Sequence, residues 1–360
     1  MNNDNQGAPM AEPPPFVSRR KLLGGMAAGG AAVALGALTG SAGATPARAL
    51  GQMRAVGQMR RVRPNALQKA IGFSQPYTTE SFWQPLMLAA QQAASKAGYL
   101  LLESHARSEL SLQLAEIEDW IADGVAAIVV LPLENSAIEP LVGKAHAKGV
   151  RMLDYSDNAL PHTDGWVVFD NLQGANVVGT YAGHWVNQTL AGKAQVAMLT
   201  HNSQLTGRQR TQGCLAALQK VAPGAKLVAQ AEGVSSPQTT GLAQSMLDAH
   251  PDINVFICVA DEGCDGVLAA FNGTHPSATR QTDMFICGFD GSAPVIEQVL
   301  AGTPVRATGA LDATAVGRAC VRAAIAVIEG KRAGSRVTFP YVLVDAHTQA
   351  LGKQLLRELA

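Results

Sequence analysis

The chain has 360 residues, of which 28 are basic and 28 acidic, so its formal net charge is zero. Apolar types make up 47% and charged types 16%, which excludes an intrinsically disordered chain, because disorder needs fewer apolar residues and a larger net charge. The balance also excludes the strongly basic composition of a nucleic-acid-binding protein. The length exceeds one comfortable core, and we expect two domains or one large α/β domain.

Residues 1–49 have the order of a secretory signal: a basic segment, a weakly apolar stretch rich in Gly and Ala, and a small-residue end at 47–49. Arg19 and Arg20 resemble the pair that a receptor recognises in twin-arginine export signals. A transmembrane anchor is the alternative, but glycines dilute a stretch that would need roughly 20 strongly apolar residues. We expect cleavage after Ala49, followed by a flexible basic lead-in at 50–69.

The cysteines all lie far from the apolar stretch, so the chain offers no site for a bacterial lipid anchor, and we expect a soluble periplasmic protein. Their odd number leaves at least one thiol unpaired. Two of them fall in apolar strand-like runs, which favours buried free thiols, with a Cys258–Cys287 disulfide as the alternative. The five are Cys214, Cys258, Cys264, Cys287 and Cys320.

From Ala70 onward, short β-rich runs alternate with amphipathic stretches, and glycines expected at helix C-termini follow the first helices. Alternation at this spacing predicts parallel sheets with right-handed crossovers. Two series of similar length predict two α/β domains that face each other. The predicted strands are 70–74, 99–103, 126–131, 151–154, 166–170, 195–200, 226–231, 255–260, 284–289, 305–310 and 337–344. The predicted helices are 83–97, 109–122, 136–148, 173–190, 206–221, 238–249, 262–272, 293–301 and 312–330.

Ligands of parallel sheets bind at the carboxyl ends of the strands. The segment Ser74–Trp83 follows the first strand and holds three of the chain's aromatic residues. Electron-rich rings stack well on the C–H faces of sugars and polyols, so Phe82 and Trp83 are candidates, although one of them could belong to the core.

Charged residues follow several other predicted strands. A carboxylate there can accept hydroxyl hydrogen bonds, which makes Asp154 and Asp170 candidates, with a helix cap or hinge as the alternative for Asp170. Arg208 and Arg210 begin a helix, where cations oppose the macrodipole and a guanidinium facing a pocket suits hydroxyls. Asp290 ends a strand in an Asp-Gly pair, which is also an ordinary turn signal.

Sequence motifs of catalysis are absent: the chain has no G-x-G, no H-E-x-x-H and no G-x-S-x-G, and its histidines lack metal-ligand spacing. We therefore expect no enzyme activity, no cofactor and no metal. A secreted carbohydrate enzyme is the alternative, because carboxylates are plentiful.

In their order and spacing, several segments resemble the periplasmic sugar-binding proteins of ABC importers, in particular the ribose-binding type. The resemblance implies a type I periplasmic binding fold: two Rossmann-like parallel-sheet lobes, joined by a three-strand hinge, that close on a sugar. It implies lobes of 70–169 plus 312–339 and of 170–311 plus 340–360. The matching segments are 71–83, 126–132, 153–154, 170–171, 208–213, 261–262 and 287–291.

Matched motif by motif, the resemblance implies that the ligand is bound in part by Ser74, Phe82, Trp83, Asp154, Arg208 and Asp290. The candidate site also includes Tyr155 and Asp170. Three positions depart from the ribose-binding pattern: Tyr155 replaces an arginine, Ala260 an asparagine and Leu311 a glutamine. Each change removes polar contacts, and a buried hydroxyl without a partner costs about 1–3 kcal/mol. We expect a smaller polyol, a deoxy sugar or another less hydroxylated carbohydrate rather than ribose.

The family also implies partners. A small carbohydrate is the ligand, a membrane ABC permease receives it, nucleic acid is not bound, and the protein is a monomer. The alternative is a ligand sensor that presents the sugar to a chemoreceptor or sensor kinase.

Overall fold

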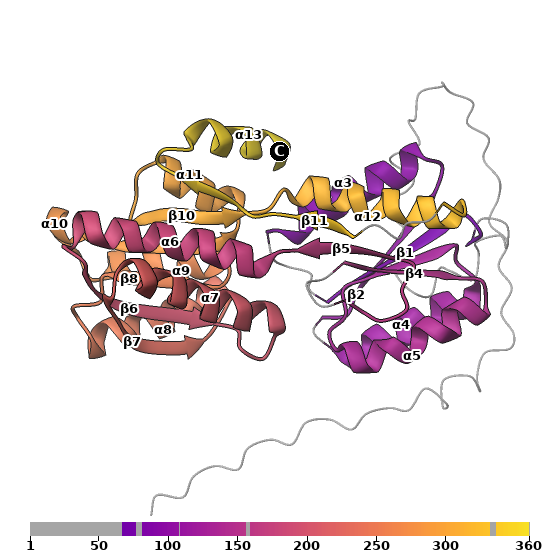
Figure 1. Cartoon of the computed structure of the whole chain (residues 1–360), viewed down its shortest axis with the longest axis horizontal. Coiled ribbons are helices and arrows are strands. Elements are labelled where there is room, and N and C mark those ends of the chain that lie inside the picture. The colour runs from indigo at the N-terminus through magenta and orange to yellow at the C-terminus, as the bar shows by residue number, and fades with distance from the viewer. Residues whose placement is uncertain (1–66, 77–80, 108, 156–158, 332–335, 360) are drawn as a thin grey trace, which may run out of the picture. The chain divides into compact units, whose positions relative to one another are not determined.

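The computed structural model describes residues 67–76, 81–107, 109–155, 159–331 and 336–359. The predicted export signal lies outside these residues, as does most of the basic lead-in. The described chain forms two six-stranded sheets with helices on both faces of each (Figure 1). The predicted α/β fold with two parallel-sheet lobes is confirmed. We call the sheet that contains β1 and its helices the first lobe, and the sheet that contains β6 and its helices the second lobe.

The first lobe has an all-parallel sheet. Its central strand β3 is buried at every position, as expected of a parallel strand covered on both faces. Helices α3 and α12 pack against each other, and α4 packs against α5. The strand order is β11 (Val337–Phe339), β5 (Gly165–Phe169), β4 (Arg151–Tyr155), β3 (Ala127–Val130), β1 (Ala70–Gln75) and β2 (Leu100–His105). The helices are α3 (Trp83–Lys96), α4 (Leu110–Asp123), α5 (Asn135–Ala147) and α12 (Ala313–Ile328).

The second lobe repeats this plan with one antiparallel edge strand, β12, beside β10. Helices α6 and α7 pack together, as do α8 and α9. The strand order is β12 (Val342–Asp345), β10 (Val305–Ala310), β9 (Phe285–Asp290), β8 (Val255–Cys258), β6 (Lys193–Thr200) and β7 (Gly224–Glu232). The helices are α6 (Asn171–Thr189), α7 (Leu205–Val221), α8 (Ser236–Ala249), α9 (Asp261–Gly273), α10 (Ala278–Thr282), α11 (Ala293–Leu300) and α13 (Gln349–Leu359).

The chain passes between the lobes at three crossovers: from β5 to α6, from β10 to α12 and from β11 to β12. The third crossover corrects the single strand predicted at 337–344. The strand is interrupted at Pro340, which has no backbone N–H to donate to a ladder, and its two halves join different sheets. Of the predicted elements, the others are present with shifted ends; α10 and α13 were not predicted.

The glycines predicted at the C-termini of the first helices have the expected backbone conformation. Gly98, Gly124 and Gly149, predicted at helix C-termini, have φ values of 78°, 71° and 74°. This left-handed conformation carries little penalty for glycine and satisfies the last carbonyls of a helix.

The cysteines are all free and buried. Cys287 packs with Cys214 on one face of the second sheet, whereas Cys258 packs with Cys264 on the other. The alternative of a Cys258–Cys287 disulfide is therefore wrong, because the two thiols point to opposite faces.

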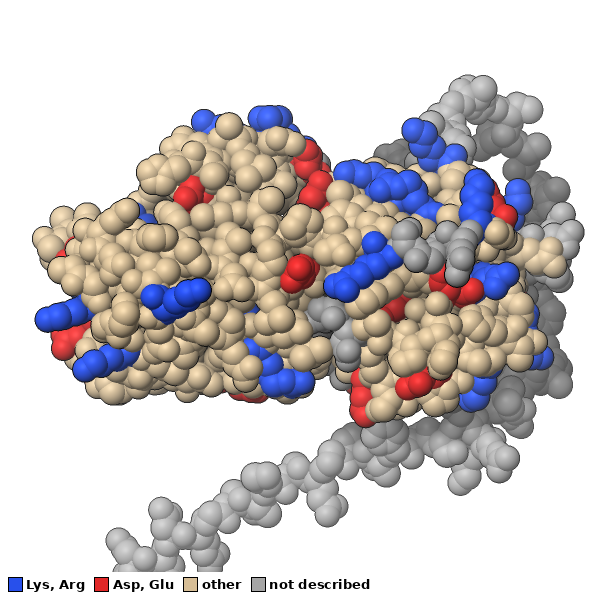
Figure 2. Space-filling model, in the orientation of Figure 1, with Lys and Arg blue, Asp and Glu red and all other residues tan. Residues whose placement is uncertain are grey.

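The surface is sparsely charged. On the face shown in Figure 2, lysine, arginine and acidic side chains are scattered among a majority of uncharged residues, as expected when only 16% of residues are charged. Among the helices of the described residues, none has the length and apolar character needed to cross a membrane.

Candidate functional site

A cavity of about 260 Å³ lies between the two lobes. It is formed where strands of both sheets end, because the loops after β1, β3, β6 and β8 and the last residue of β9 all contribute to it. Carboxyl ends of parallel strands are where α/β folds bind ligands. The structure thus has a cavity at the strand ends, where the sequence placed its candidate site.

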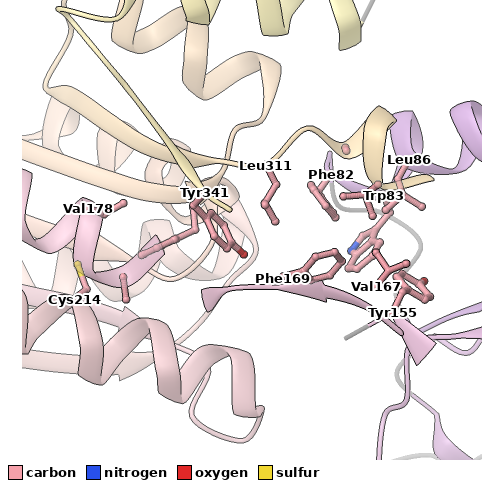
Figure 3. Packing of buried hydrophobic residues seen from close by; sticks show 14 of the residues in the cluster. Phe82, Trp83, Leu86, Tyr155, Val167, Phe169, Val178, Cys214, Leu311 and Tyr341 are labelled. Atoms are coloured by element: carbon pink, nitrogen blue, oxygen red, sulfur yellow. The ribbon is translucent and has the colours of Figure 1, made fainter. Parts of the chain in front are cut away.

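The first-lobe wall is a cluster of aromatic rings and short apolar segments. Phe82, Trp83 and Phe169 line the cavity, together with Leu131–Leu133. The Phe82 ring lies edge-on to Trp83 with centroids 5.0 Å apart, and to Phe169 at 6.1 Å; Figure 3 shows the group. Edge-to-face pairs at these distances are favourable, so the rings hold one another in place beside the cavity.

Tyr155 lies behind this wall. It is fully buried, with its ring centroid 5.0 Å from Phe73 and 6.3 Å from Trp83. Its hydroxyl donates to the Ser74 carbonyl at 3.4 Å, and burial raises its pKa well above the ordinary value. Where the resemblance implied a polar position, this side chain instead supports the aromatic wall.

The second-lobe wall contains a buried ion pair. Nη2 of Arg210 lies 2.8 Å from Oδ1 of Asp290 and also donates to the Tyr341 hydroxyl at 2.6 Å. Its Nε donates to Asn171 Oδ1 at 2.9 Å, and Nη1 donates to the Val259 carbonyl at 2.7 Å. Arg210 and Asp290 both line the cavity. One guanidinium therefore connects the cavity to residues of two crossovers, because Asn171 begins α6 and Tyr341 lies between β11 and β12.

The charges of this pair are set by burial and by each other. Burial raises the pKa of Asp290, and the Arg210 guanidinium offsets only part of that increase. Burial lowers the pKa of Arg210, but Asp290 and Tyr341 raise it above its ordinary value. Asp290 also has a φ of 111°, a left-handed conformation that costs a non-glycine residue about 1–3 kcal/mol and is typical of functional sites.

Arg208 lies at the rim of the cavity and is not part of the buried ion pair. It is exposed, and its Nη1 donates to the carbonyls of Asn202 at 2.7 Å and Ser203 at 3.2 Å. Two positions along a helix rotate a side chain by about 200°, so Arg208 and Arg210 cannot face the same way. The sequence argument preferred Arg208, whereas the structure pairs Asp290 with Arg210. The helical period is a signal that could have separated the two arginines, although it does not say which one points inward.

Three other candidates make hydrogen bonds within the first lobe or at the start of α6. Ser74 is fully buried and accepts a hydrogen bond from Gln113 Nε2 at 3.2 Å. Asp154 is also fully buried, and its Oδ2 accepts from the Leu160 N–H at 2.6 Å. Asp170 is the N-cap of α6, with Oδ1 accepting from Gln173 N at 3.0 Å.

These three side chains, like Tyr155, are not among the residues that line the cavity. The structure thus brings Phe82, Trp83, Arg208 and Asp290 together and leaves the other four outside. The cap that was the alternative for Asp170 is observed. Direct ligand contact by Ser74, Asp154, Tyr155 and Asp170 stays a prediction.

No group of three or more His, Cys, Asp or Glu side chains within the described ranges is arranged to hold a metal ion. His201 lines the cavity, and burial lowers its pKa, which favours the neutral imidazole. The wall therefore offers hydrogen bonds, one ion pair and aromatic faces, which suits the binding of a polar organic molecule.

The chain is similar in sequence to known proteins. A family model described as a periplasmic binding protein domain matches residues 71–332. The ribose import binding protein of Bacillus subtilis is 26% identical over 282 residues, which are 78% of this chain and 88% of that protein.

Two solved structures share the fold. An ABC transporter solute-binding protein from Bacillus halodurans with bound myo-inositol is 19% identical, with a TM-score of 0.71 covering 81% of this chain and 99% of that one. A 5-methylthioribose transporter solute-binding protein from Thermotoga lettingae, in complex with 5-methylthioribose, is 21% identical, with a TM-score of 0.70 covering 81% and 91%.

Proposed function

The chain belongs to the periplasmic binding protein domain family, and we propose that it is an exported binding protein that captures a small carbohydrate between its lobes. The family consists of substrate-binding transport proteins whose members work with ABC permeases. On this proposal the protein is a soluble, non-enzymatic monomer that closes around its ligand and delivers it to such a permease.

The observation that carries the proposal is the pairing of two unlike walls around one cavity. Phe82, Trp83 and Phe169 present ring surfaces on one side, and Arg210 with Asp290 presents charged donors and acceptors on the other. A carbohydrate has both kinds of surface: its C–H faces stack on rings, and its hydroxyls bind charged groups strongly.

The lining also supports a ligand with fewer hydroxyls than ribose. Leu311 and Ala260, which replace the polar residues of the ribose-binding pattern, both line the cavity. Leu131, Pro132 and Leu133 extend the apolar surface. A hydroxyl held against these groups without a partner costs about 1–3 kcal/mol, whereas a methyl, methylthio or deoxy position there costs nothing in hydrogen bonding. The solved structure with bound 5-methylthioribose, in which a methylthio group replaces one hydroxyl of ribose, shows that the fold accommodates a less hydroxylated sugar.

A thermal-shift screen followed by calorimetry tests the ligand class. The probes are ribose, 2-deoxyribose, 5-methylthioribose, glycerol and myo-inositol. A ligand at 100 times its Kd stabilises the fold by about 2.7 kcal/mol, and we expect such a shift from the smaller polyol glycerol or from one of the less hydroxylated sugars, 2-deoxyribose and 5-methylthioribose. Clear stabilisation by ribose or myo-inositol with none by the less hydroxylated probes contradicts the ligand class, and no shift with any carbohydrate contradicts the function.

Leu311→Gln sharpens the screen, because it restores the polar group of the ribose-binding pattern at a cavity-lining position. We expect it to move the preference toward ribose. Leu88→Gln, at an exposed leucine on α3, is the matched control and is expected to leave the preference unchanged.

Export is tested separately from binding. Replacement of both Arg19 and Arg20 by lysine is expected to retain the protein in the cytoplasm, as measured by immunoblotting of cell fractions, because a receptor reads the arginine pair. Arg48→Lys is the control. Undiminished export of the double variant contradicts the twin-arginine assignment, and light scattering of the exported protein tests the monomer.

A further inference from the structure

One carboxylate of the second lobe is hydrogen-bonded to the first lobe outside the crossovers. Oε1 of Glu262 accepts from the backbone N–H of Ser81 at 2.9 Å and from its hydroxyl at 2.7 Å. Ser81 lies between β1 and α3 in the first lobe, and Glu262 is the second residue of α9 in the second. The two residues are 181 positions apart in the chain.

The contact is made by segments that follow non-crossover strands of the two sheets. β1 is three strands from the crossover strand β5 in the first sheet, and β8, which precedes Glu262, is two strands from the crossover strand β10 in the second. The bond therefore joins the two lobes in addition to the three crossovers, and it has to break when the lobes separate.

The same contact fixes the aromatic wall. Ser81 directly precedes Phe82 and Trp83, whose rings line the cavity. Glu262 follows Ala260, which lines it from the other lobe. A bond between the backbone of Ser81 and the side chain of Glu262 therefore sets where the two rings sit relative to the second lobe.

The environment of Glu262 affects the strength of this bond. Its carboxylate lies in the first turn of α9, where a helix N-terminus favours negative charge. Burial is the main cause of the raised pKa of Asp261, Asp265 and Asp290, and the charge of Glu262 adds to each increase, so Glu262 shares this end of the lobe with other acidic groups. The N–H and the hydroxyl of Ser81 both donate to Oε1 of Glu262 and offset the repulsion between these acidic groups. Hydrogen bonds to a charged acceptor are stronger than those between neutral groups.

We propose that Glu262 and Ser81 form a latch that stabilises the closed arrangement of the two lobes and thereby completes the binding cavity. The latch goes beyond the proposed function, because it needs no assumption about which carbohydrate is bound. It assigns Glu262 as a positioning residue, acting through Ser81 on Phe82 and Trp83.

Small-angle X-ray scattering of the ligand-free protein tests the latch. Glu262→Gln keeps the size of the side chain but removes its charge, and we expect the ratio of open to closed molecules to rise about tenfold, with a larger radius of gyration. Ser81→Ala removes the hydroxyl donor but keeps the N–H, so it is expected to act in the same direction and less strongly. The double variant should open less than the sum of the two single-variant effects, because both substitutions weaken the same interaction.

Matched controls separate a latch from a general loss of stability. Glu297→Gln, at an exposed position on α11 of the same lobe, and Ser95→Ala, at an exposed position on α3, should scatter like the wild type. The thermal midpoint of Glu262→Gln should stay close to that of the wild type while its radius increases. Wild-type scattering from Glu262→Gln and Ser81→Ala overturns the proposal. Because no ligand is present, failure of the carbohydrate screen leaves this result intact.

Discussion

The two walls of the cavity are built by different physical means on the same strand plan. The first-lobe wall consists of side chains that hold one another by ring packing, with Phe82, Trp83 and Phe169 at its surface and Tyr155 behind them. The second-lobe wall is a hydrogen-bonded charge network around Arg210. The sheets have equivalent strand orders, so the difference comes from the side chains at the strand ends and not from topology.

The comparison predicts how each wall fails. A wall held by packing loses energy gradually as atoms are removed, since its neighbours can relax into the space. A network around a buried charge fails abruptly, because removal of one partner leaves the other charged, desolvated and unpaired.

Arg210→Ala is expected to give the largest effect. It leaves Asp290 without its cation and the hydroxyl of Tyr341 without one of its partners, at a cost of about 3–5 kcal/mol in the free energy of unfolding. Chemical denaturation measures it, with Arg208→Ala as the control, because an exposed arginine contributes about 0–1 kcal/mol. Equal losses for the two arginines would show that the second wall is not organised around Arg210.

Trp83→Ala tests the first wall and should cost less, about 3 kcal/mol, the lower end for a buried aromatic truncated to alanine. One side of the ring already faces the cavity, so fewer neighbours lose contacts. Trp83→Phe, which keeps an aromatic face toward Phe82, is the control, and unfolding curves should place it between alanine and wild type. A loss above that of Arg210→Ala would reverse the comparison.

Two glycines offer a matched pair of smaller perturbations. A Cβ at Gly72 of β1 would meet the Trp120 ring, and one at Gly288 of β9 would meet Asp261 and lie 2.6 Å from Cys264 Sγ. Each alanine variant overpacks its core and should cost about 1–3 kcal/mol in unfolding free energy. Only Gly288→Ala should also weaken ligand binding, because Asp261 lies beside the charged wall; a reduced affinity in Gly72→Ala instead would contradict this assignment.

The pH dependence of stability is the mildest test. Asp261 is fully buried, with Oδ2 accepting from Ser292 N at 2.7 Å and Oδ1 accepting from Thr308 Oγ1 at 2.8 Å. Burial and the Asp290 charge raise its pKa well above the ordinary value. A raised folded-state pKa gives a stabilising contribution that is full below the unfolded-state value, about 3.9, and is lost as the pH rises through the folded-state value.

The wild type should therefore lose stability relative to Asp261→Asn as the pH rises above about 4. Thermal unfolding at several pH values measures the difference, with Asp252→Asn at an exposed position of the same lobe as the control. A constant difference between wild type and Asp261→Asn across this range would show that Asp261 does not titrate in this way.

Local features of the fold were predictable because they depend on neighbours in the chain. Apolar runs such as 127–130 and 255–258 became buried strands, and Gly98, Gly124 and Gly149 took the left-handed conformation at helix ends. The last strand was not predictable as two pieces, because its period continues through 337–344 while the sheet that each half joins depends on distant partners.

The site was predicted in part for the same reason. Phe82, Trp83 and Asp290 line the cavity, as their places at the ends of predicted elements indicated. Asp154 has an equivalent place, yet its carboxylate accepts from Leu160 N, a contact that its position at a strand end does not indicate.

The sequence by itself determined that this chain forms alternating strands and helices, that its strand ends concentrate aromatic and charged residues, and that catalytic motifs are missing. These properties depend on periodicity, turn residues and residue type, which act over a few positions. Only the tertiary structure decided which residues meet. Arg210 rather than Arg208 pairs with Asp290, Tyr155 supports a wall instead of lining it, and Ser81 binds Glu262. Side-chain direction and long-range contact depend on how the helices pack onto the sheets, and no local pattern encodes that packing.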